Sequence, residues 1–142
     1  MRYLLDTNTI SHLMRANPTA LARLTGCDPG QVFISAITEA EIRFGLAKNP
    51  SATRLRRAVD ELAARIGVLD FTTTTAREYG KLRAELEISG RPMSPLDTLI
   101  AATALEYSQE SAGMTLVTND RAFFRIRRLT VEDWTAPEAV PA

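Results

Sequence analysis

The stretch RYLLDTNTISHLM, residues 2–14, places a short apolar segment before a polar turn and then spaces Ile10, Leu13 and Met14 as on one side of a helix. We interpret residues 2–5 as a strand and the segment after the turn as a helix. Asp6 is the first residue after this strand. A strand followed directly by a helix is the building unit of α/β domains with parallel sheets.

Similar units recur along the rest of the chain. Apolar segments bounded by turn residues predict strands at 31–35, 68–71, 114–118 and 129–134. Helical spacing and capping residues predict helices at 18–26, 38–47, 51–66, 75–89 and 95–108, with a helical turn at 122–124. Here Thr38 is the predicted N-cap of one helix, and Gly67 is predicted to end another. The alternation predicts an α/β fold, a three-layer sandwich with a central, mainly parallel sheet of four to five strands and helices on both faces.

The composition is that of one globular domain, since 45% of the 142 residues are hydrophobic and 24% are charged. Neither a linker nor a repeat divides the chain, so we expect one domain at 1–135 and a flexible C-terminal tail at 136–142. The longest apolar run, 99–105, is far shorter than the ~20 residues of a membrane helix. The apolar segment before Asp6 is also too short for a signal peptide. We therefore expect a cytoplasmic protein without a membrane span.

The scarcity of cysteine and histidine excludes several kinds of site. Cys27 is the single cysteine, so an internal disulfide and a multi-cysteine zinc site are excluded. His12 is the single histidine, which leaves little support for Ser/His/Asp or Cys/His catalysis. A formal net charge of zero argues against a broad basic surface, although arginines cluster at 54–57 and 121–128. We expect carboxylates and hydroxyls to carry any chemistry.

Four acidic residues fall near the predicted carboxyl edge of the sheet. Asp6 and Asp120 follow predicted strands, and Glu41 and Asp97 lie in the first turns of predicted helices. In open parallel sheets, ligands bind beyond the carboxyl ends of the strands. The order of the elements therefore predicts a shared acidic pocket.

Each acid also has an ordinary structural interpretation. At the third helical position, Glu41 and Asp97 would interact favourably with the helix dipole, while Asp6 would cap a helix and Asp120 would close an Asx turn. Carboxylates that gather in one pocket repel one another unless a cation compensates them. Oxygen ligands favour Mg²⁺ or Mn²⁺, and such ions support phosphodiester hydrolysis.

Four segments together resemble the PIN-domain nucleases, and among them the VapC-type toxins of bacterial toxin–antitoxin pairs. The resemblance covers nearly the whole chain, through Leu4-Leu5-Asp6-Thr7-Asn8, the segment 34–45 around Glu41, the segment 95–102 around Asp97, and Leu116-Val117-Thr118-Asn119-Asp120 with 123 and 129–134 behind it. Each fragment alone is weakly specific, whereas their order and spacing are strongly specific.

The resemblance implies a metal-dependent endoribonuclease. It implies that Asp6, Glu41, Asp97 and Asp120 bind one or two Mg²⁺ or Mn²⁺ ions that activate water. It further implies supporting hydrogen bonds from Asn8 and Thr118 and phosphate contacts from Arg43 and Arg121. Asp120 is a weaker expectation than the other acids, because asparagine is frequent at the fourth position of such toxins. The resemblance also implies an RNA substrate, inhibition by a small antitoxin protein and, as is usual for such toxins, a homodimer.

Two alternatives stay open on the sequence alone. The first is a catalytically silent PIN-fold binding protein in which the acids act as caps. The second is an aspartate-based phosphohydrolase with Asp6 as the nucleophile, although Asn8 stands where a dehalogenase-like site has a second aspartate. The helices predicted at 38–47 and 51–66 are candidates for the antitoxin groove, but a core-facing helix has the same pattern.

Overall fold

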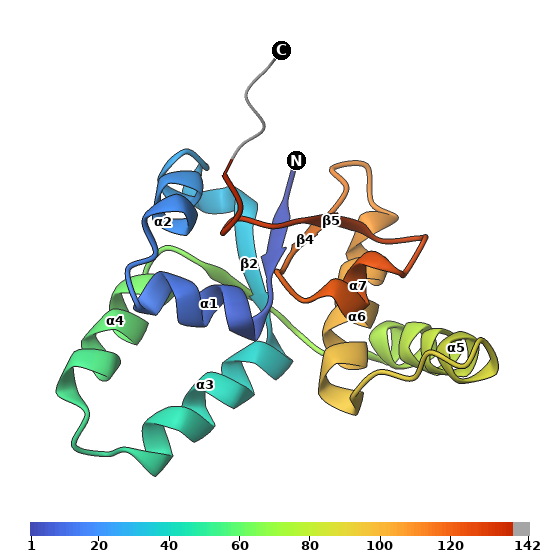
Figure 1. Ribbon diagram of the computed structural model, residues 1–142, viewed down its shortest axis with the longest axis horizontal. Helices are drawn as coiled ribbons and strands as arrows, with labels where there is room; N and C mark the ends of the chain where they lie inside the picture. Colours follow the sequence, from blue (N-terminus) through green and yellow to red (C-terminus); the bar gives the residue numbers. More distant parts are fainter. Residues whose placement is uncertain (138–142) are drawn as a thin grey trace.

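The computed structural model describes residues 1–137 as an α/β sandwich around one sheet (Figure 1). The sheet has five strands in the order β3-β2-β1-β4-β5, and all four neighbouring pairs are parallel. The strands are β1 Tyr3–Leu5, β2 Val32–Ser35, β3 Gly67–Leu69, β4 Thr115–Val117 and β5 Thr130–Glu132. The predicted three-layer fold with a mainly parallel sheet is therefore confirmed.

Helices cover both faces of the sheet (Figure 1). The bounds are α1 Thr7–Met14, α2 Pro18–Thr25, α3 Ala36–Lys48, α4 Thr53–Ala63, α5 Thr73–Ile88, α6 Pro95–Ser108 and α7 Arg121–Phe124, with a 3-10 turn η1 at Pro29–Gln31. Side chains of α1, α2 and α4 pack in one core cluster, and those of α5, α6 and α7 pack in the other. This arrangement leaves the carboxyl ends of the strands as the place where loops meet.

The central strand shows why both faces have to be covered. Leu4 belongs to the cluster under α5 and α6, whereas Leu5 belongs to the cluster under α1 and α2. Both are 0% exposed. Because successive side chains of a strand point to opposite faces, an apolar run such as 3–5 needs helices on each side.

The start of α3 differs from the prediction. Thr38 is not the N-cap, because the helix begins at Ala36 and the Ser35 hydroxyl accepts a hydrogen bond from the Thr38 backbone N–H at 3.1 Å. Ser35 ends β2 in an extended conformation, so strand and helix follow each other without a loop. Glu41 therefore lies in the second turn of α3, and the capping interpretation of Glu41 is wrong.

The prediction that Gly67 ends a helix is also wrong. The helix α4 ends at Ala63 with Ala64 as its C-cap, and Gly67 is the first residue of β3. A Cβ at this glycine would lie 2.8 Å from the Phe33 ring on the neighbouring strand. The glycine is needed for the close approach of β2 and β3.

Two further expectations concern the chain ends and membranes. Trp134 is buried and packs against Tyr3, with ring centroids 5.4 Å apart, so the core reaches the end of the predicted domain. Residues 138–142 of the predicted tail lie outside the described residues, and the division at residue 135 stays a prediction. Within residues 1–137, no helix is long and apolar enough to cross a membrane.

Candidate active site

The candidate site lies where the carboxyl ends of β1 and β4 meet. Leu5 and Val117 are paired in register, and the Asp6 backbone N–H donates a hydrogen bond to the Val117 carbonyl at 3.1 Å. Asp6 and Thr118 are the next residues on the two strands. Two segments far apart in sequence therefore place their side chains at one edge of the sheet.

Asp6 is buried and held on both carboxylate oxygens. It is 2% exposed and is the N-cap of α1, where Oδ1 accepts the Thr9 backbone N–H at 2.8 Å. The Thr118 hydroxyl donates a hydrogen bond to Oδ2. The pKa of Asp6 is raised by burial, lowered by these hydrogen bonds, and raised again by the charge of Asp97, with a net upward shift.

Asp97 lies at the third position of α6, as the sequence predicts. Ser94 is the N-cap, and its hydroxyl accepts the Asp97 backbone N–H at 3.2 Å. The Asp97 carboxylate is near enough to raise the pKa of Asp6 by charge repulsion. Within residues 1–137 this carboxylate makes no hydrogen bond or ion pair. The position of Asp97 in the first turn of α6 is therefore compatible with both the helix-dipole and the pocket interpretations.

Glu41 is connected to the end of β1 through Thr7. The Thr7 hydroxyl donates a hydrogen bond to Oε1 of Glu41 at 2.7 Å and lies 3.3 Å from the Thr38 hydroxyl. The Ser35 hydroxyl lies 3.4 Å from that of Thr38, which extends the polar contacts to the end of β2. A residue adjacent to Asp6 therefore orients Glu41.

Asp120 has a clear structural role and an indirect connection to Asp6. It is the N-cap of α7, where Oδ1 accepts the Ala122 backbone N–H at 3.0 Å. The Asp120 backbone N–H donates to the Thr118 hydroxyl oxygen at 3.0 Å, and that hydroxyl donates to Asp6. Thr118 therefore connects the two acids.

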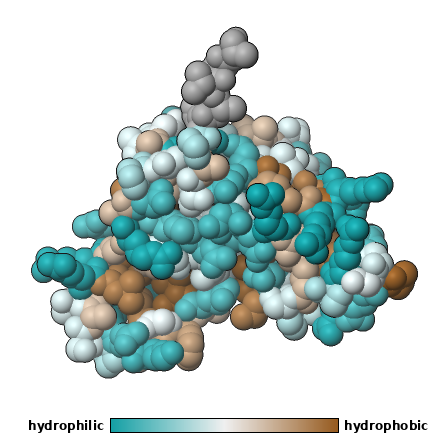
Figure 2. All heavy atoms as spheres, in the orientation of Figure 1, coloured by the Kyte–Doolittle hydropathy of each residue, from teal (hydrophilic) through white to brown (hydrophobic). Residues whose placement is uncertain are grey.

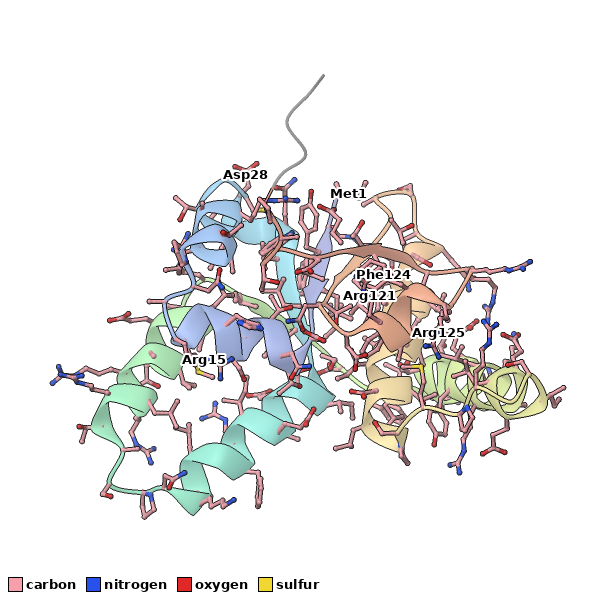
Figure 3. The ribbon with its side chains drawn as sticks, in the orientation of Figure 1. Met1, Arg15, Asp28, Arg121, Phe124 and Arg125 are labelled. Carbon is pink, nitrogen blue, oxygen red and sulfur yellow. The ribbon has the colours of Figure 1, made fainter. Side chains whose placement is uncertain are left out.

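The remaining predicted residues take no part in the contacts described above within residues 1–137. Asn8 is exposed on the first turn of α1 and has no hydrogen-bonded side chain within residues 1–137. Arg43 is exposed and pairs with Glu39 at 3.4 Å, and Arg121 is exposed at the first position of α7 (Figure 3). Their predicted roles toward a metal or phosphate stay predictions.

A model of the PIN domain matches residues 3–129 of this chain, which is most of its length and includes all four acids. The chain belongs to the PIN-domain family. Among curated relatives, the tRNA(fMet)-specific endonuclease VapC of Shigella flexneri is 32% identical over 136 residues, which cover 95% of this chain and 99% of the relative. The VapC ribonuclease Y4jK of Sinorhizobium fredii is 36% identical over 135 residues, covering 89% of this chain and 93% of the relative.

The fold of this PIN domain is also similar to solved structures of VapBC complexes. A chain of the VapBC2 complex from Rickettsia felis, bound to a promoter DNA fragment, is 31% identical with a TM-score of 0.84, and the match covers 94% of this chain and 99% of that chain. A chain of DNA-bound VapBC from Salmonella typhimurium is 33% identical with a TM-score of 0.82, covering 94% and 98%. The resemblance to VapC-type PIN domains is confirmed over nearly the full length.

Of the four acids, Asp6 and Asp97 interact directly, whereas Glu41 and Asp120 are connected to the Asp6 region through threonine hydroxyls. Within residues 1–137, no three His, Cys, Asp or Glu side chains lie together as a group that could hold a metal. Asp6 and Asp97 interact electrostatically, while Thr7 holds Glu41 and Thr118 joins Asp120 to Asp6. A metal site formed by all four acids therefore stays a prediction.

Three threonines of the site were not predicted as a group. The family resemblance implies a role for Thr118, whereas neither it nor the sequence pattern indicates one for Thr7 or Thr9. Thr9 donates its backbone N–H to Asp6 and its hydroxyl to the Val117 carbonyl at 2.9 Å. Hydroxyl residues directly after a strand-end acid are the sequence signal that could have indicated them.

Proposed function

We propose that this PIN-domain chain is a metal-dependent endoribonuclease and the toxin of a toxin–antitoxin pair. The observation that carries the proposal is the buried Asp6 carboxylate beside the charge of Asp97 at the carboxyl edge of a parallel sheet. Burial of a carboxylate near a second one is costly, and proteins retain such pairs mainly at functional sites. Because RNA is the proposed substrate, we further propose that the protein acts in the cytoplasm.

The donor chemistry of this pair fits a divalent cation. The Thr9 backbone N–H and the Thr118 hydroxyl, which donate hydrogen bonds to Asp6, are uncharged, so neither neutralises its charge. Carboxylate oxygens without sulfur or imidazole favour Mg²⁺ or Mn²⁺. When bound, such an ion supplies an activated water and stabilises charge on a phosphodiester.

The residues of the chain would have three roles, which are binding the cation, orienting its ligands and binding the RNA phosphates. Asp6 and Asp97 would hold the cation, with Glu41 and Asp120 as further ligands. Thr118 orients Asp6 through its hydroxyl, and Thr7 orients Glu41 in the same way. Asn8, in the first turn of α1, would add a supporting hydrogen bond. Arg43 and Arg121 would bind phosphate groups of the RNA.

Metal titration tests this proposal directly. We expect calorimetry to detect Mn²⁺ and Mg²⁺ binding by the wild-type chain, with a loss of at least tenfold in affinity for Asp97→Asn. Asp28→Asn is the matched control, because Asp28 is exposed and precedes η1 and β2, at the amino end of that strand, whereas Asp6 follows the carboxyl end of β1. RNA cleavage should follow metal affinity, so wild type and Asp28→Asn should cleave and Asp97→Asn should cleave more slowly. tRNA(fMet), on which the Shigella flexneri relative acts, is among the first substrates to test. Equal absence of binding and cleavage in all three proteins would leave the catalytically silent alternative.

The antitoxin would bind along α1, α3 and α4. An apolar cavity there is lined by Ile10, Ile34, Ile42, Val59, Leu62, Ala63, Ile66 and Val68 with Glu39 and Arg43. A second hollow, lined among others by Met14, Leu46 and Leu55, includes Thr7 and Glu41. Figure 2 shows apolar side chains at the lower left, over the region of α1, α3 and α4. A segment bound in both hollows would reach Glu41, which explains inhibition by a partner.

Growth experiments test the toxin assignment and the partner together. Induced expression should stop growth, and co-expression of a neighbouring small open reading frame should restore it. Leu55→Glu, which places a charge at a half-buried position in the wall of the hollow that includes Glu41, should prevent rescue without relieving toxicity. We also propose that the free chain is a homodimer, as sedimentation would show. Harmless overproduction of folded wild-type chain would contradict the toxin role but not the nuclease chemistry.

A further inference from the structure

The short helix α7 carries one exposed aromatic side chain between two arginines. Arg121, Phe124 and Arg125 are at positions i, i+3 and i+4, with Arg125 as the C-cap, and these positions share one side of a helix. Phe124 is 48% exposed, whereas the adjacent Phe123 is 1% exposed and packs in the core. Figure 3 shows Arg121, Phe124 and Arg125 together at α7. We call these three residues the α7 face.

The α7 face continues into a hollow between α5 and the segment after α7. Its lining consists of Leu82, Glu85, Leu86, Ser89, Arg91, Arg125, Ile126, Arg127 and Arg128. Arg128 is compensated, because Glu78 and Glu85 lie 3.5 Å and 3.3 Å from its guanidinium group.

The other arginines of this region differ from Arg128 in their partners. Within residues 1–137, no ion pair or side-chain hydrogen bond involves the guanidinium groups of Arg91, Arg121, Arg125 and Arg127. All four are exposed. The chain as a whole has a formal net charge of zero, so this concentration of positive charge is local. A local basic surface of this kind attracts an anionic ligand.

The combination of side chains favours single-stranded nucleic acid over other anions. Guanidinium groups bind phosphates through paired donors, and an exposed aromatic ring stacks on a base of any sequence. A small phosphate ligand would explain the arginines but not the exposed ring. Exposure of Phe124 costs hydrophobic free energy in the free protein, which a stacked base would recover.

The position of the α7 face relates it to the proposed acidic site. Asp120 is both the last acid of that site and the N-cap of α7, and Arg121 is the next residue. Phe124 and Arg125 follow within one turn, and the hollow with Arg91 and Arg127 lies beyond them. A strand that leaves the acids in this direction meets the arginines and the ring in succession.

We propose that an RNA strand leaving the acidic site crosses the α7 face, where one base stacks on Phe124 and phosphates bind Arg121 and Arg125. Arg91 and Arg127 extend this path for the following nucleotides. The inference rests on the proposed ribonuclease function for the identity of the strand. It assigns the binding of single-stranded RNA beyond the cleaved bond to a surface outside the acidic site.

Binding without cleavage tests the surface first. The affinity of the full chain for a labelled 12-nucleotide single-stranded RNA is measured by fluorescence anisotropy in EDTA, which prevents hydrolysis. We expect Phe124→Ala and Arg125→Ala to weaken binding at least fivefold and Phe124→Trp to restore it. Arg125→Ala should also lower the salt slope by about 0.7. Arg56→Ala, which removes an exposed arginine on α4, should bind within twofold of wild type.

Cleavage kinetics then relate the surface to the reaction. Two substrates are compared, an RNA that extends six nucleotides beyond the cleaved bond and a two-nucleotide substrate. For each, the KM of Phe124→Ala is divided by the KM of wild type, and this ratio should be at least fivefold larger for the long RNA. The kcat values of Phe124→Ala and wild type should be similar on both substrates. Binding and KM values within twofold of wild type for both α7 variants would overturn the inference. So would variants that lose binding of polyglutamate but keep that of RNA, since the surface would then serve an acidic protein. A wild-type chain that binds RNA through the α7 face but cleaves none would instead overturn the proposed function alone.

Discussion

Thr118 and Asp6 are 112 positions apart in the sequence, and the Thr118 hydroxyl donates a hydrogen bond to Oδ2 of Asp6. The contact exists because β1 and β4 are adjacent parallel strands that end in register. Thr118 is 0% exposed, and its hydroxyl oxygen also accepts the Asp120 backbone N–H. The side chain is therefore fixed from two directions, and it fixes Asp6 in turn.

Removal of this hydroxyl should reduce activity more than stability. Thr118→Val keeps the volume but loses the donor to Asp6, so we expect RNA cleavage to fall by about 10- to 100-fold, as for other residues that orient metal ligands. Thr118→Ser should recover most of the rate. The pKa of Asp6 should rise further in Thr118→Val, because this hydrogen bond lowers it, and the acid limb of the pH–rate profile should move to higher pH.

Thr115→Val provides the matched control for that experiment. Thr115 is a buried threonine on the same strand, but it lies at the amino end of β4, away from the site. Its substitution should leave the cleavage rate and the pH profile within twofold of wild type. Equal losses in the two valine variants would show that a general disturbance of β4 is responsible.

The contribution of the Asp6 carboxyl to the stability of the metal-free chain should decrease as the pH rises. Because burial raises the pKa of Asp6, the folded state binds a proton at this carboxyl more tightly than the unfolded chain does. The resulting stabilisation is fully present below the unfolded pKa, about 3.9, and is lost as the pH rises through the folded pKa. Asp6→Asn keeps an N-cap side chain without the charge, so its free energy of unfolding should exceed that of wild type increasingly toward neutral pH.

Urea unfolding in EDTA between pH 4 and pH 7.5 measures this difference. Asp60→Asn, at an exposed position on α4, is the control, and its difference from wild type should stay nearly constant over the range. Saturating Mn²⁺ should stabilise wild type more than Asp6→Asn, because the ion binds the folded state. A difference that is constant with pH for Asp6→Asn would contradict the electrostatic account.

Thr7 should act on the reaction through Glu41. Its hydroxyl donates to Oε1 of Glu41 at 2.7 Å, so Thr7→Val releases that side chain. We expect a loss of about tenfold in cleavage rate and a loss of about 1 kcal/mol or less in stability. In a Glu41→Gln background, Thr7→Val should have little further effect. A full additional tenfold loss in that background would mean that Thr7 acts on another group.

The sequence predicted the fold and the location of the acids because both depend on local patterns. Short apolar strands followed by capped helices gave the parallel sheet, and the Ser94-Pro95 cap with Asp97 at the third position was confirmed. Asp6 was predicted as a cap and is one. Such features need only neighbouring residues, so one sequence is enough to predict them.

The contacts between the acids could not be predicted in the same way. The hydrogen bond from Thr7 to Glu41 depends on how α1 and α3 pack, and that from Thr118 to Asp6 depends on the register of β1 and β4. The N-cap of α3 was misplaced because Ser35 and Thr38 are both good caps, and the end of β2 decides between them. The role of Gly67 could not be predicted either, because it depends on the Phe33 ring on the neighbouring strand.

Gly67 gives a stability prediction that does not involve the site. In Gly67→Ala, the new Cβ would lie 2.8 Å from the Phe33 ring, so β2 and β3 would have to separate or the ring would have to move. We expect a loss of about 1–3 kcal/mol in the free energy of unfolding, as for other overpacked positions. Gly80→Ala is the matched control, because nothing lies within 4 Å of its Cβ and it is inside α5, where alanine should add up to about 1 kcal/mol. Phe33→Leu should reduce the cost of Gly67→Ala if the ring is the cause, whereas an unchanged cost in the double variant would point to the backbone of β3 instead.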